Sequence, residues 1–382
     1  MSDNQEANIL PPGHMIESYK IVDHIGHGGF GEIYSVFDTR NNKKYAMKVE
    51  LRSANRQGLI QEIQFFENLH PSLLFPEYIY SGSNNDYRYL VMELLGPSLS
   101  KMRRLLPNHR YTPINSIRLS YHMLRCIEQF HQQGFIHRDI KPGNFLIRND
   151  ETRSNPVVLT DFGLSKKFLI DTKHIPDQDQ VGFVGTCKYA SIHAHEGREL
   201  SRRDDLLSWF YSIVELAESR VPWPGTRDRD RTFYMKRSTR PEHLCRSLPI
   251  EFAQIYNNLI NLEFTQKPDY DWIKNMLNEC LRKVASMPTP GSGIDASLGN
   301  ININLLNLTE GGDQSLAYDW EALDDDVIRS ISAIPLKNSR NSDQLGKNLN
   351  NNANDENKDY SNSVNDANNK NGKDEGACCN IQ

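Results

Sequence analysis

The run HRDIKPGN at residues 137–144 constrains this chain more than any other part of its sequence. It places a carboxylate, an amine and a carboxamide, those of Asp139, Lys141 and Asn144, within six positions, and the apolar residues 145–147 follow directly. A run with this many defined residue types at fixed spacing rarely arises by chance. The run therefore predicts a catalytic loop in which Asp139 accepts or orients a proton.

The triplet Asp161-Phe162-Gly163 follows this loop and is preceded by the strand-like residues VVLT. Alone, such a triplet is common and usually marks a turn. Placed shortly after a catalytic loop, it predicts that Asp161 binds a metal ion together with Asn144.

Glycines recur near the amino terminus in the run GHGGFG, residues 26–31. A dinucleotide-binding turn would continue into a helix, with an acidic residue about 20 positions further on. Residues 32–37 instead alternate in the manner of a strand. Glycines between two strands form a hairpin flap whose amides can approach phosphates closely, so we expect a nucleotide-binding hairpin. Its expected contacts are Ile25, Gly26, Gly28, Phe30, Gly31 and Ile33.

The next strand-like segment carries Ala46 and Lys48. A lysine at this place would point into a cleft and contact the α- and β-phosphates, and it would need a carboxylate to hold it. Glu62, in the helix expected over residues 59–69, is the obvious partner. An isolated Ala-x-Lys is more simply a surface lysine on an edge strand, but the flap upstream and the acidic helix downstream favour the functional interpretation.

These groups together fit the transfer of a phosphoryl group from ATP with Mg²⁺. Such a transfer needs little covalent help, but it does need the nucleotide's charge neutralised and a hydroxyl aligned with the γ-phosphate. Lys48, the flap amides and a Mg²⁺ ion held by Asn144 and Asp161 would supply the first requirement. Asp139 would supply the second, with Lys141 near the γ-phosphate.

The order of strand-like and helix-like patterns along the chain indicates the fold class. Residues 19–49 read as an antiparallel meander, and a helix over 59–69 and a strand over 87–93 follow. Long helices are expected over 114–133 and 204–219, and the second is apolar nearly all round, as a central helix would be. The order predicts an α+β fold with a small β-rich lobe first and a larger helical lobe second.

With these motifs in place, residues 18–285 resemble the eukaryotic protein kinase fold, which is bilobal. The details resemble the casein kinase I superfamily, which includes the tau-tubulin kinases. The stretches that carry this resemblance are LLGPSL, GTCKYASIHAHEGRELSRRDDL and KPDYDWI, whereas VGFVGT and YDWE lean toward the tau-tubulin kinases, so the subgroup stays open. Because a lysine stands two positions after Asp139, the resemblance implies transfer to serine or threonine rather than tyrosine.

The resemblance also assigns residues of a nucleotide pocket. It places Met92 at the back of an adenine pocket and makes Glu93 and Leu95 hinge contacts. Leu146 is a further expected contact with the nucleotide, and Asp205 is expected to be a buried aspartate that braces the catalytic loop.

The segment that follows Asp161-Phe162-Gly163 indicates which substrates we expect. Residues 190–192 read Ala-Ser-Ile where most protein kinases have Ala-Pro-Glu, a departure shared by casein kinase I enzymes, which are generally active without activation-loop phosphorylation. That family favours acidic or already phosphorylated protein substrates. Lys188 stands where an arginine is usual, and Arg231 or Lys236 is the candidate for a second basic position. Lysine lacks arginine's fork for phosphate, so acidic preference is a stronger expectation than strict phosphate priming.

Two other kinds of function fit less well. A pseudokinase scaffold would be favoured by the loss of Lys48, Asp139, Asn144 or Asp161, yet all four are present. A small-molecule kinase would lack the run YASIHAHEGRELSRRDD, which is typical of protein kinases.

Composition and charge limit the classes of partner and the cellular compartments that we expect. The net charge of −5 and the pI of about 6.2 give no reason to expect nucleic-acid binding. Cysteines 126, 187, 245 and 280 are scattered without a CxxC pair, which favours reduced thiols over zinc. Neither a signal peptide nor an apolar run of about 18 residues is apparent. We expect a monomer in the cytoplasm, with part of it at a membrane or in the nucleus.

Composition also divides the chain. We expect a flexible leader over residues 1–14 and the two lobes over 15–95 and 96–335, with a Gly/Pro/Ser-rich insertion near 287–316. Residues 336–382 are rich in Asn, Asp, Ser and Lys and almost devoid of apolar side chains. Such a segment cannot bury enough surface to offset its ordering entropy, so we expect a disordered tail.

The last residues suggest a lipid anchor. Cys379 begins a C-a-a-X pattern that ends in Gln382 and indicates farnesylation, and Cys378 could take a second lipid. Asn380 is not aliphatic, and an unmodified terminus is the simpler alternative. A peripheral association with membranes through Cys378 and Cys379 is therefore an expectation from this pattern alone.

Overall fold

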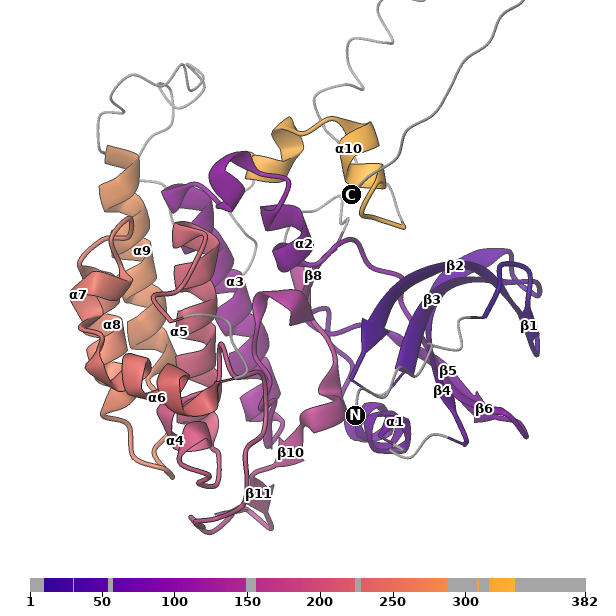
Figure 1. Cartoon of the computed structure of the whole chain (residues 1–382), viewed down its shortest axis with the longest axis horizontal. Coiled ribbons are helices and arrows are strands. Elements are labelled where there is room, and N and C mark those ends of the chain that lie inside the picture. The colour runs from indigo at the N-terminus through magenta and orange to yellow at the C-terminus, as the bar shows by residue number, and fades with distance from the viewer. Residues whose placement is uncertain are drawn as a thin grey trace, which may run out of the picture. The chain divides into compact units, whose positions relative to one another are not determined.

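Alternating side chains of residues 15–92 build an antiparallel sheet in the computed structural model, with the strand order β1-β2-β3-β4-β6-β5 (Figure 1). The period of two places Tyr34, Val36 and Met47 on one buried face. Gly31 lets β3 cross closely over β4, because a Cβ at this position would lie 2.2 Å from the Val49 carbonyl oxygen. The strands are β1 (Met15–Ile16), β2 (Tyr19–Gly28), β3 (Gly31–Asp38), β4 (Lys43–Leu51), β5 (Tyr78–Ser83) and β6 (Tyr87–Met92).

Helix α1 (Leu59–Asn68) lies against this sheet. Its buried side chains recur at helical spacing, and Glu62 falls on the same inward face as Leu59, Ile63 and Phe66. The apolar periodicity of α1 thus carries a carboxylate into the interior.

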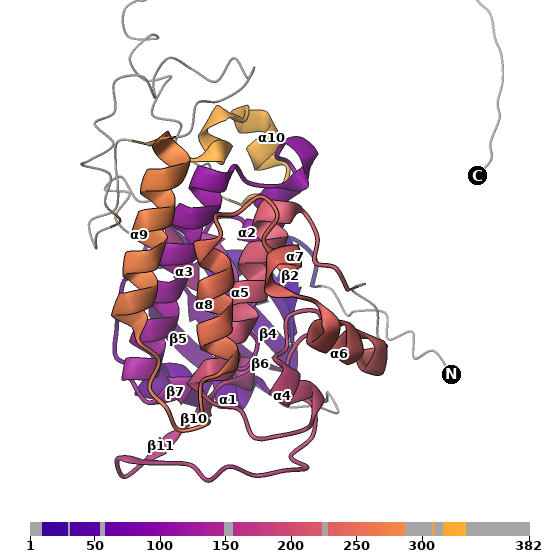
Figure 2. The ribbon, with the colours of Figure 1, turned by 90° about the vertical axis from the view of Figure 1, so that its left-hand side faces the viewer.

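Four long helices form the core of the second lobe and run side by side (Figure 2). They are α3 (Pro113–Gln132), α5 (Arg202–Glu218), α8 (Glu251–Ile260) and α9 (Tyr270–Ser286). Helix α3 begins after its N-cap Thr112 and ends before Gly134, whose φ of +84° suits glycine. Every residue from 203 to 217 of α5 is buried, which confirms the prediction of a central helix.

Shorter elements surround this core. The helices are α2 (Leu99–Arg103), α4 (Ile192–His195), α6 (Arg229–Ser238), α7 (Pro241–Leu244) and α10 (Asp325–Arg329). The strands are β7 (Phe135–Ile136), β8 (Phe145–Ile147), β9 (Val157–Leu159), β10 (Lys166–Lys167), β11 (Leu169–Ile170) and β12 (Lys173–His174).

Phe162 joins α1 to the helical lobe. Its ring stacks on Phe65 at a centroid distance of 5.0 Å and on Phe130 of α3 at 5.3 Å, and it meets Phe66 and Phe75 edge-on. This aromatic packing fixes α1 beside the segment that carries Asp161. The predicted order of a β-rich and then a helical lobe is confirmed.

The structure describes residues 10–29, 31–53, 58–148, 156–223, 228–286, 308 and 316–333. All of them belong to one unit, residues 1–338. Most of the expected leader and of the 287–316 insertion, and all of the tail from residue 336, lie outside the described residues. None of the described helices is both long and apolar enough to span a bilayer.

Candidate active site

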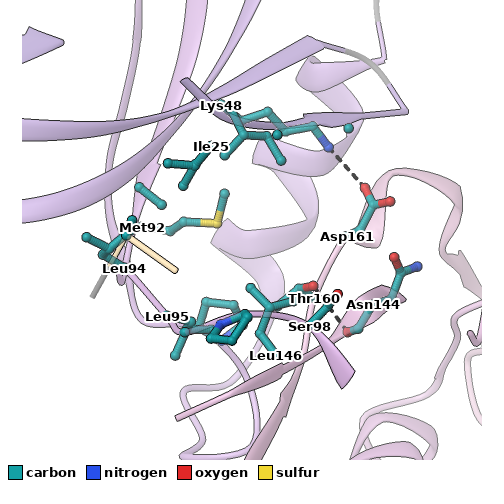
Figure 3. Close-up of a pocket in the computed structure, with 18 of the residues that line it drawn as sticks. Ile25, Lys48, Met92, Leu94, Leu95, Ser98, Asn144, Leu146, Thr160 and Asp161 are labelled. Carbon is teal, nitrogen blue, oxygen red and sulfur yellow. Dashed lines mark hydrogen bonds and ion pairs between the residues drawn. The ribbon is translucent and has the colours of Figure 1, made fainter. Parts of the chain in front are cut away.

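Lys48 of β4 points between two carboxylates. Its Nζ lies 2.6 Å from Glu62 Oε2. It also lies 3.0 Å from Asp161 Oδ1, an interaction drawn as a dashed line in Figure 3. The side chains of Lys48 and Glu62 are both buried. Burial alone would lower the pKa of Lys48, but the two carboxylates outweigh it and raise the pKa above its usual value. Lys48 is therefore a permanently charged amine at this site, held by the carboxylate that the sequence indicated.

Asp205 of α5 braces the catalytic loop. Its Oδ2 accepts the backbone amide of His137 at 2.7 Å, and its Oδ1 accepts that of Arg138 at 2.8 Å. Asp205 is fully buried and also receives His131 Nε2 at 2.9 Å. Burial would raise the pKa of Asp205, but these hydrogen bonds hold it below its usual value. Arg138 has a φ of +65°, a conformation that persists only where its surroundings impose it.

Asp139 is fixed from both sides. Its Oδ2 lies 2.5 Å from Lys141 Nζ, and its Oδ1 accepts the hydroxyl of Thr186 at 2.7 Å. Thr186 also lies 3.3 Å from Lys141 Nζ. The carboxylate is thus held in one orientation by two donors, as a residue that accepts a hydroxyl proton would need to be.

Asn144 and Asp161 line the same cavity. Asn144 donates from Nδ2 to the carbonyl of Asp139 at 2.9 Å, so its Oδ1 is the atom that could bind a cation. Burial opposes ionisation of Asp161, but Lys48 holds the pKa of this carboxyl below its usual value. Two oxygen donors beside a space for phosphates suit Mg²⁺, which keeps waters and takes one or two carboxylates plus phosphate oxygens. Asn144 and Asp161 are thus placed as the expected ligands of Mg²⁺ would be.

A cavity of about 250 Å³ lies between the two lobes, close to the lower end of the ~300–1,000 Å³ usual for small-molecule sites. Ile25 and Lys48 lie on one side and Leu146 and Asn144 on the other (Figure 3). The predicted residues that line the cavity are Ile25, Gly26, Gly28, Ile33, Ala46, Lys48, Glu62, Met92, Glu93, Leu95, Asn144, Leu146 and Asp161.

Three of the predicted nucleotide contacts differ from this pattern. Phe30 lies outside the described residues. Gly31 is not part of the cavity lining, and its lack of a side chain serves the crossing of β3 over β4. The Glu93 carboxylate is held by Arg148 at 2.6 Å and 2.9 Å, and the Glu93 amide donates to the Glu77 carbonyl at 2.9 Å, so the backbone carbonyl of Glu93 is the group that could meet a ligand.

Comparison with known proteins agrees with this geometry. The profile of the protein kinase domain matches residues 19–287. This chain belongs to the protein kinase family. A protein of Dictyostelium discoideum described as a probable serine/threonine-protein kinase is similar, with 36% identity over 263 residues that cover 69% of this chain and 53% of the relative. The kinase thus spans about half the length of the curated relative that it matches.

Sequence reasoning missed several residues of the kinase's site. Thr186, which contacts both Asp139 and Lys141, lies in the quoted run GTCKY, but nothing in that run indicated its partner. Lys101 of α2 lines the cavity and donates to the carbonyl of Ile25 at 3.1 Å. Residues 331–333, beyond the matched domain, also line the cavity. No local pattern could reveal such contacts between distant segments.

The two lysines considered for substrate binding are already engaged. Lys188 forms a close ion pair with Glu215, which Arg103 also contacts at 3.2 Å. Lys236 is 1% exposed and donates to the backbone carbonyls of Cys187 and Ala190, at 2.8 and 2.6 Å. Of the two candidates for a second basic position, Arg231 or Lys236, the buried Lys236 is therefore not available to a substrate. Its amine instead binds carbonyls of the activation segment, residues 161–192.

Proposed function

We propose that this kinase transfers the γ-phosphate of ATP to serine or threonine hydroxyls of proteins. The observation that carries this proposal is the arrangement of Lys48, Asp139, Asn144 and Asp161 around one cavity and its edge, each held by hydrogen bonds. The name of the Dictyostelium relative and the lysine two positions after Asp139 support serine or threonine as acceptors.

In this mechanism the protein chiefly positions and neutralises. Lys48 would bind the α- and β-phosphates, because its charge is fixed by Glu62. Asp139 would accept or orient the proton of the attacking hydroxyl, while Thr186 keeps its carboxylate in place. Mg²⁺, held by Asn144 and Asp161, would neutralise charge on the β- and γ-phosphates when bound.

We propose further that the enzyme is of the casein kinase I type and needs no phosphorylation of its activation segment. The contacts that hold this segment support the proposal, because Lys236 and Arg138 bind its backbone carbonyls directly. Lys236 binds two of its carbonyls, and Arg138 Nε donates to the Leu164 carbonyl at 2.7 Å. Phosphatase-treated enzyme should retain its full activity, and loss of activity after this treatment would refute the point.

We propose a preference for acidic or phosphorylated substrates. Since Lys188 and Lys236 are engaged, Arg229 and Arg231 at the start of α6 are the better candidates to meet such substrates. Both are exposed, and the Arg229 guanidinium lies 4.8 Å from the ring of Phe183 in the activation segment. This position supports contact with a peptide bound along that segment.

A peptide library tests both the reaction and the preference. Purified enzyme would be incubated with Mg-ATP and peptides with serine, threonine or tyrosine acceptors in acidic, pre-phosphorylated and basic contexts, with Asp161→Asn as the inactive control. We expect transfer to serine and threonine in acidic or phosphorylated contexts, and a weaker preference after Arg229→Ala with Arg231→Ala. A pseudokinase scaffold would bind ATP without transfer above the control.

We also propose a cytoplasmic monomer that associates in part with membranes through lipidation of Cys379 and Cys378. The C-a-a-X pattern is its support, and both cysteines lie outside the described residues. Cell fractionation of the Cys379→Ser variant tests it: the membrane-bound share should fall. An unchanged distribution would argue for an unmodified terminus.

A further inference from the structure

Residues 316–333 follow the matched kinase domain and return to its cavity. Helix α10 of this segment lies near α2, as Figures 1 and 2 both show. Ile331, Ser332 and Ala333, which follow α10 and its C-cap residue Ser330, line the same cavity as Ile25 and Leu146. All three are half-buried. The described end of the chain therefore borders the space assigned to the nucleotide.

Polar contacts anchor the start of this segment on α3. The Asp319 carboxylate accepts the amide and the hydroxyl of Thr112, at 2.7 and 2.9 Å, and Asn115 Nδ2 at 2.6 Å. Arg118, itself 1% exposed, donates to the Ala317 carbonyl at 3.3 Å. Asp319 also places a negative charge at the N-terminus of a 20-residue helix, which favours it.

Apolar contacts extend this anchor toward the cavity. The rings of Tyr318 and Trp320 stack with centroids 4.3 Å apart, and the Arg118 guanidinium lies 4.0 Å from the Tyr318 ring. Ile328 of α10 is 1% exposed and belongs to the main hydrophobic core, which extends through the helical lobe to α1. The amide of Ile331 then donates to the Ile328 carbonyl at 3.1 Å. The position of Ile331 is thus set by a turn that begins at a fully buried residue.

The segment borders the cavity without filling it. Ile25, Met92 and Leu146, which would contact the base, remain half-exposed with the segment in place. A volume of about 250 Å³ stays open beside Ile331. An ATP molecule entering this space would therefore meet the segment as a wall.

We propose that Ile331, Ser332 and Ala333 are nucleotide-binding residues, which supply a third wall to the ATP pocket from outside the kinase domain. The inference rests on the proposed function, because it takes the ligand of the cavity to be ATP. The apolar side chain of Ile331 would lose water against the nucleotide, as that of Ile25 would from the opposite lobe. Removing this wall should weaken nucleotide binding and leave the residues that transfer phosphate in place.

Calorimetric titration with Mg²⁺ and a non-hydrolysable ATP analogue tests the proposal without using catalysis. Three chains would be compared: the full chain, a chain ending at Ala333 and a chain ending at Ser330. We expect equal Kd values for the first two and a rise of about tenfold for the third, the scale of one apolar contact. The full-length variant Ile331→Ala should also raise Kd several-fold. Its matched control is Val327→Ala, whose 40% exposed side chain lies on α10 and is not among the lining residues.

The possible outcomes separate this inference from the proposed function. Equal binding by all chains and variants would overturn the wall and leave ATP binding intact. Tighter binding by the chain ending at Ser330 would also overturn it, since the segment would then obstruct the pocket. Binding by none of them, the full chain included, would refute the ATP site and the wall together. Thermal unfolding shows whether each protein is folded. If the chain ending at Ser330 is unfolded, the Kd of the Ile331→Ala variant decides between these outcomes.

Discussion

The Oδ1 atom of Asp205, on α5, lies 2.8 Å from the backbone amide of Arg138, the residue of the catalytic loop with a φ of +65°. The Oδ2 atom of the same carboxylate accepts the neighbouring amide of His137. One buried side chain thus imposes a conformation that would otherwise cost about 1–3 kcal/mol. The geometry at Asp139 depends on this brace, one residue along the chain.

Asp205→Asn tests the brace. Asparagine has the same shape but only one acceptor oxygen, so one of the two amides would face an NH₂ group. We expect the free energy of unfolding to fall by about 2–4 kcal/mol and kcat to fall at least about tenfold, with KM for ATP within about threefold. Urea unfolding and steady-state kinetics measure both, with Asp271→Asn, whose side chain is 86% exposed, as the control. An unchanged kcat would show that the loop holds its shape without Asp205.

Because Lys48 and Glu62 form a buried ion pair, we predict that substitutions can restore stability without restoring activity. Lys48→Met leaves a buried carboxylate without its partner, which should cost about 3–5 kcal/mol of stability. The double variant Lys48→Met/Glu62→Met removes both charges and should regain most of this stability, while nucleotide binding and phosphate transfer stay impaired. Thermal unfolding and analogue titration would show this. A double variant as unstable as the single one would contradict the account of the pair.

The hydrogen bond from Thr186 to Asp139 predicts that serine, but not alanine, can replace Thr186 without a large loss of activity. Thr186→Ala removes the hydroxyl that donates to Asp139 at 2.7 Å, so the carboxylate could rotate toward Lys141. We expect kcat to fall by about 10–100-fold, whereas Thr186→Ser should stay within a few-fold of the wild type. Kinetics at saturating ATP and peptide test this. Equal losses in both variants would mean that the methyl group, and not the hydroxyl, matters.

Lys236 predicts a pH dependence of stability. Burial lowers its pKa from 10.5 to about 7, so between these pH values the unfolded chain binds more protons at this residue than the folded chain does. Its contribution to stability therefore rises with pH from about 7 to 10 and is constant below about 7. The stability of the wild type relative to Lys236→Met should be greater at pH 9 than at pH 6.5.

Unfolding at several pH values, with the exposed Lys173→Met as control, measures this difference. The control should show no such trend. A wild-type advantage that shrinks as pH rises would contradict the assignment of Lys236 as a buried amine with a lowered pKa.

The sequence predicted the parts of the site that short motifs encode. Lys48, Asp139, Asn144 and Asp161 each stood in a run whose neighbours identified the local structure, and helical spacing brought Glu62 to the inward face of α1. The two-lobed fold followed in the same way from the change of period along the chain.

The contacts that it missed depend on how distant elements pack. Lys236 lies in a polar-looking helix, and its burial follows from the approach of α6 to the activation segment and to Trp223, 5.2 Å away. Gly31 belongs to a glycine motif, but its closest neighbour is a carbonyl of the adjacent strand. Ile331 reaches the cavity only because Tyr318 and Ile328 are anchored elsewhere.

The most direct test of the central claim is the rate at which labelled γ-phosphate passes from Mg-ATP to the acidic protein casein, compared between the wild type and Asp139→Asn. We predict transfer to serine and threonine by the wild type and a loss of at least about a hundredfold in kcat for the variant, with the analogue Kd unchanged. Equal rates in the two proteins, or a wild type that binds ATP without transferring phosphate, would contradict the assignment of this site as a protein kinase active site.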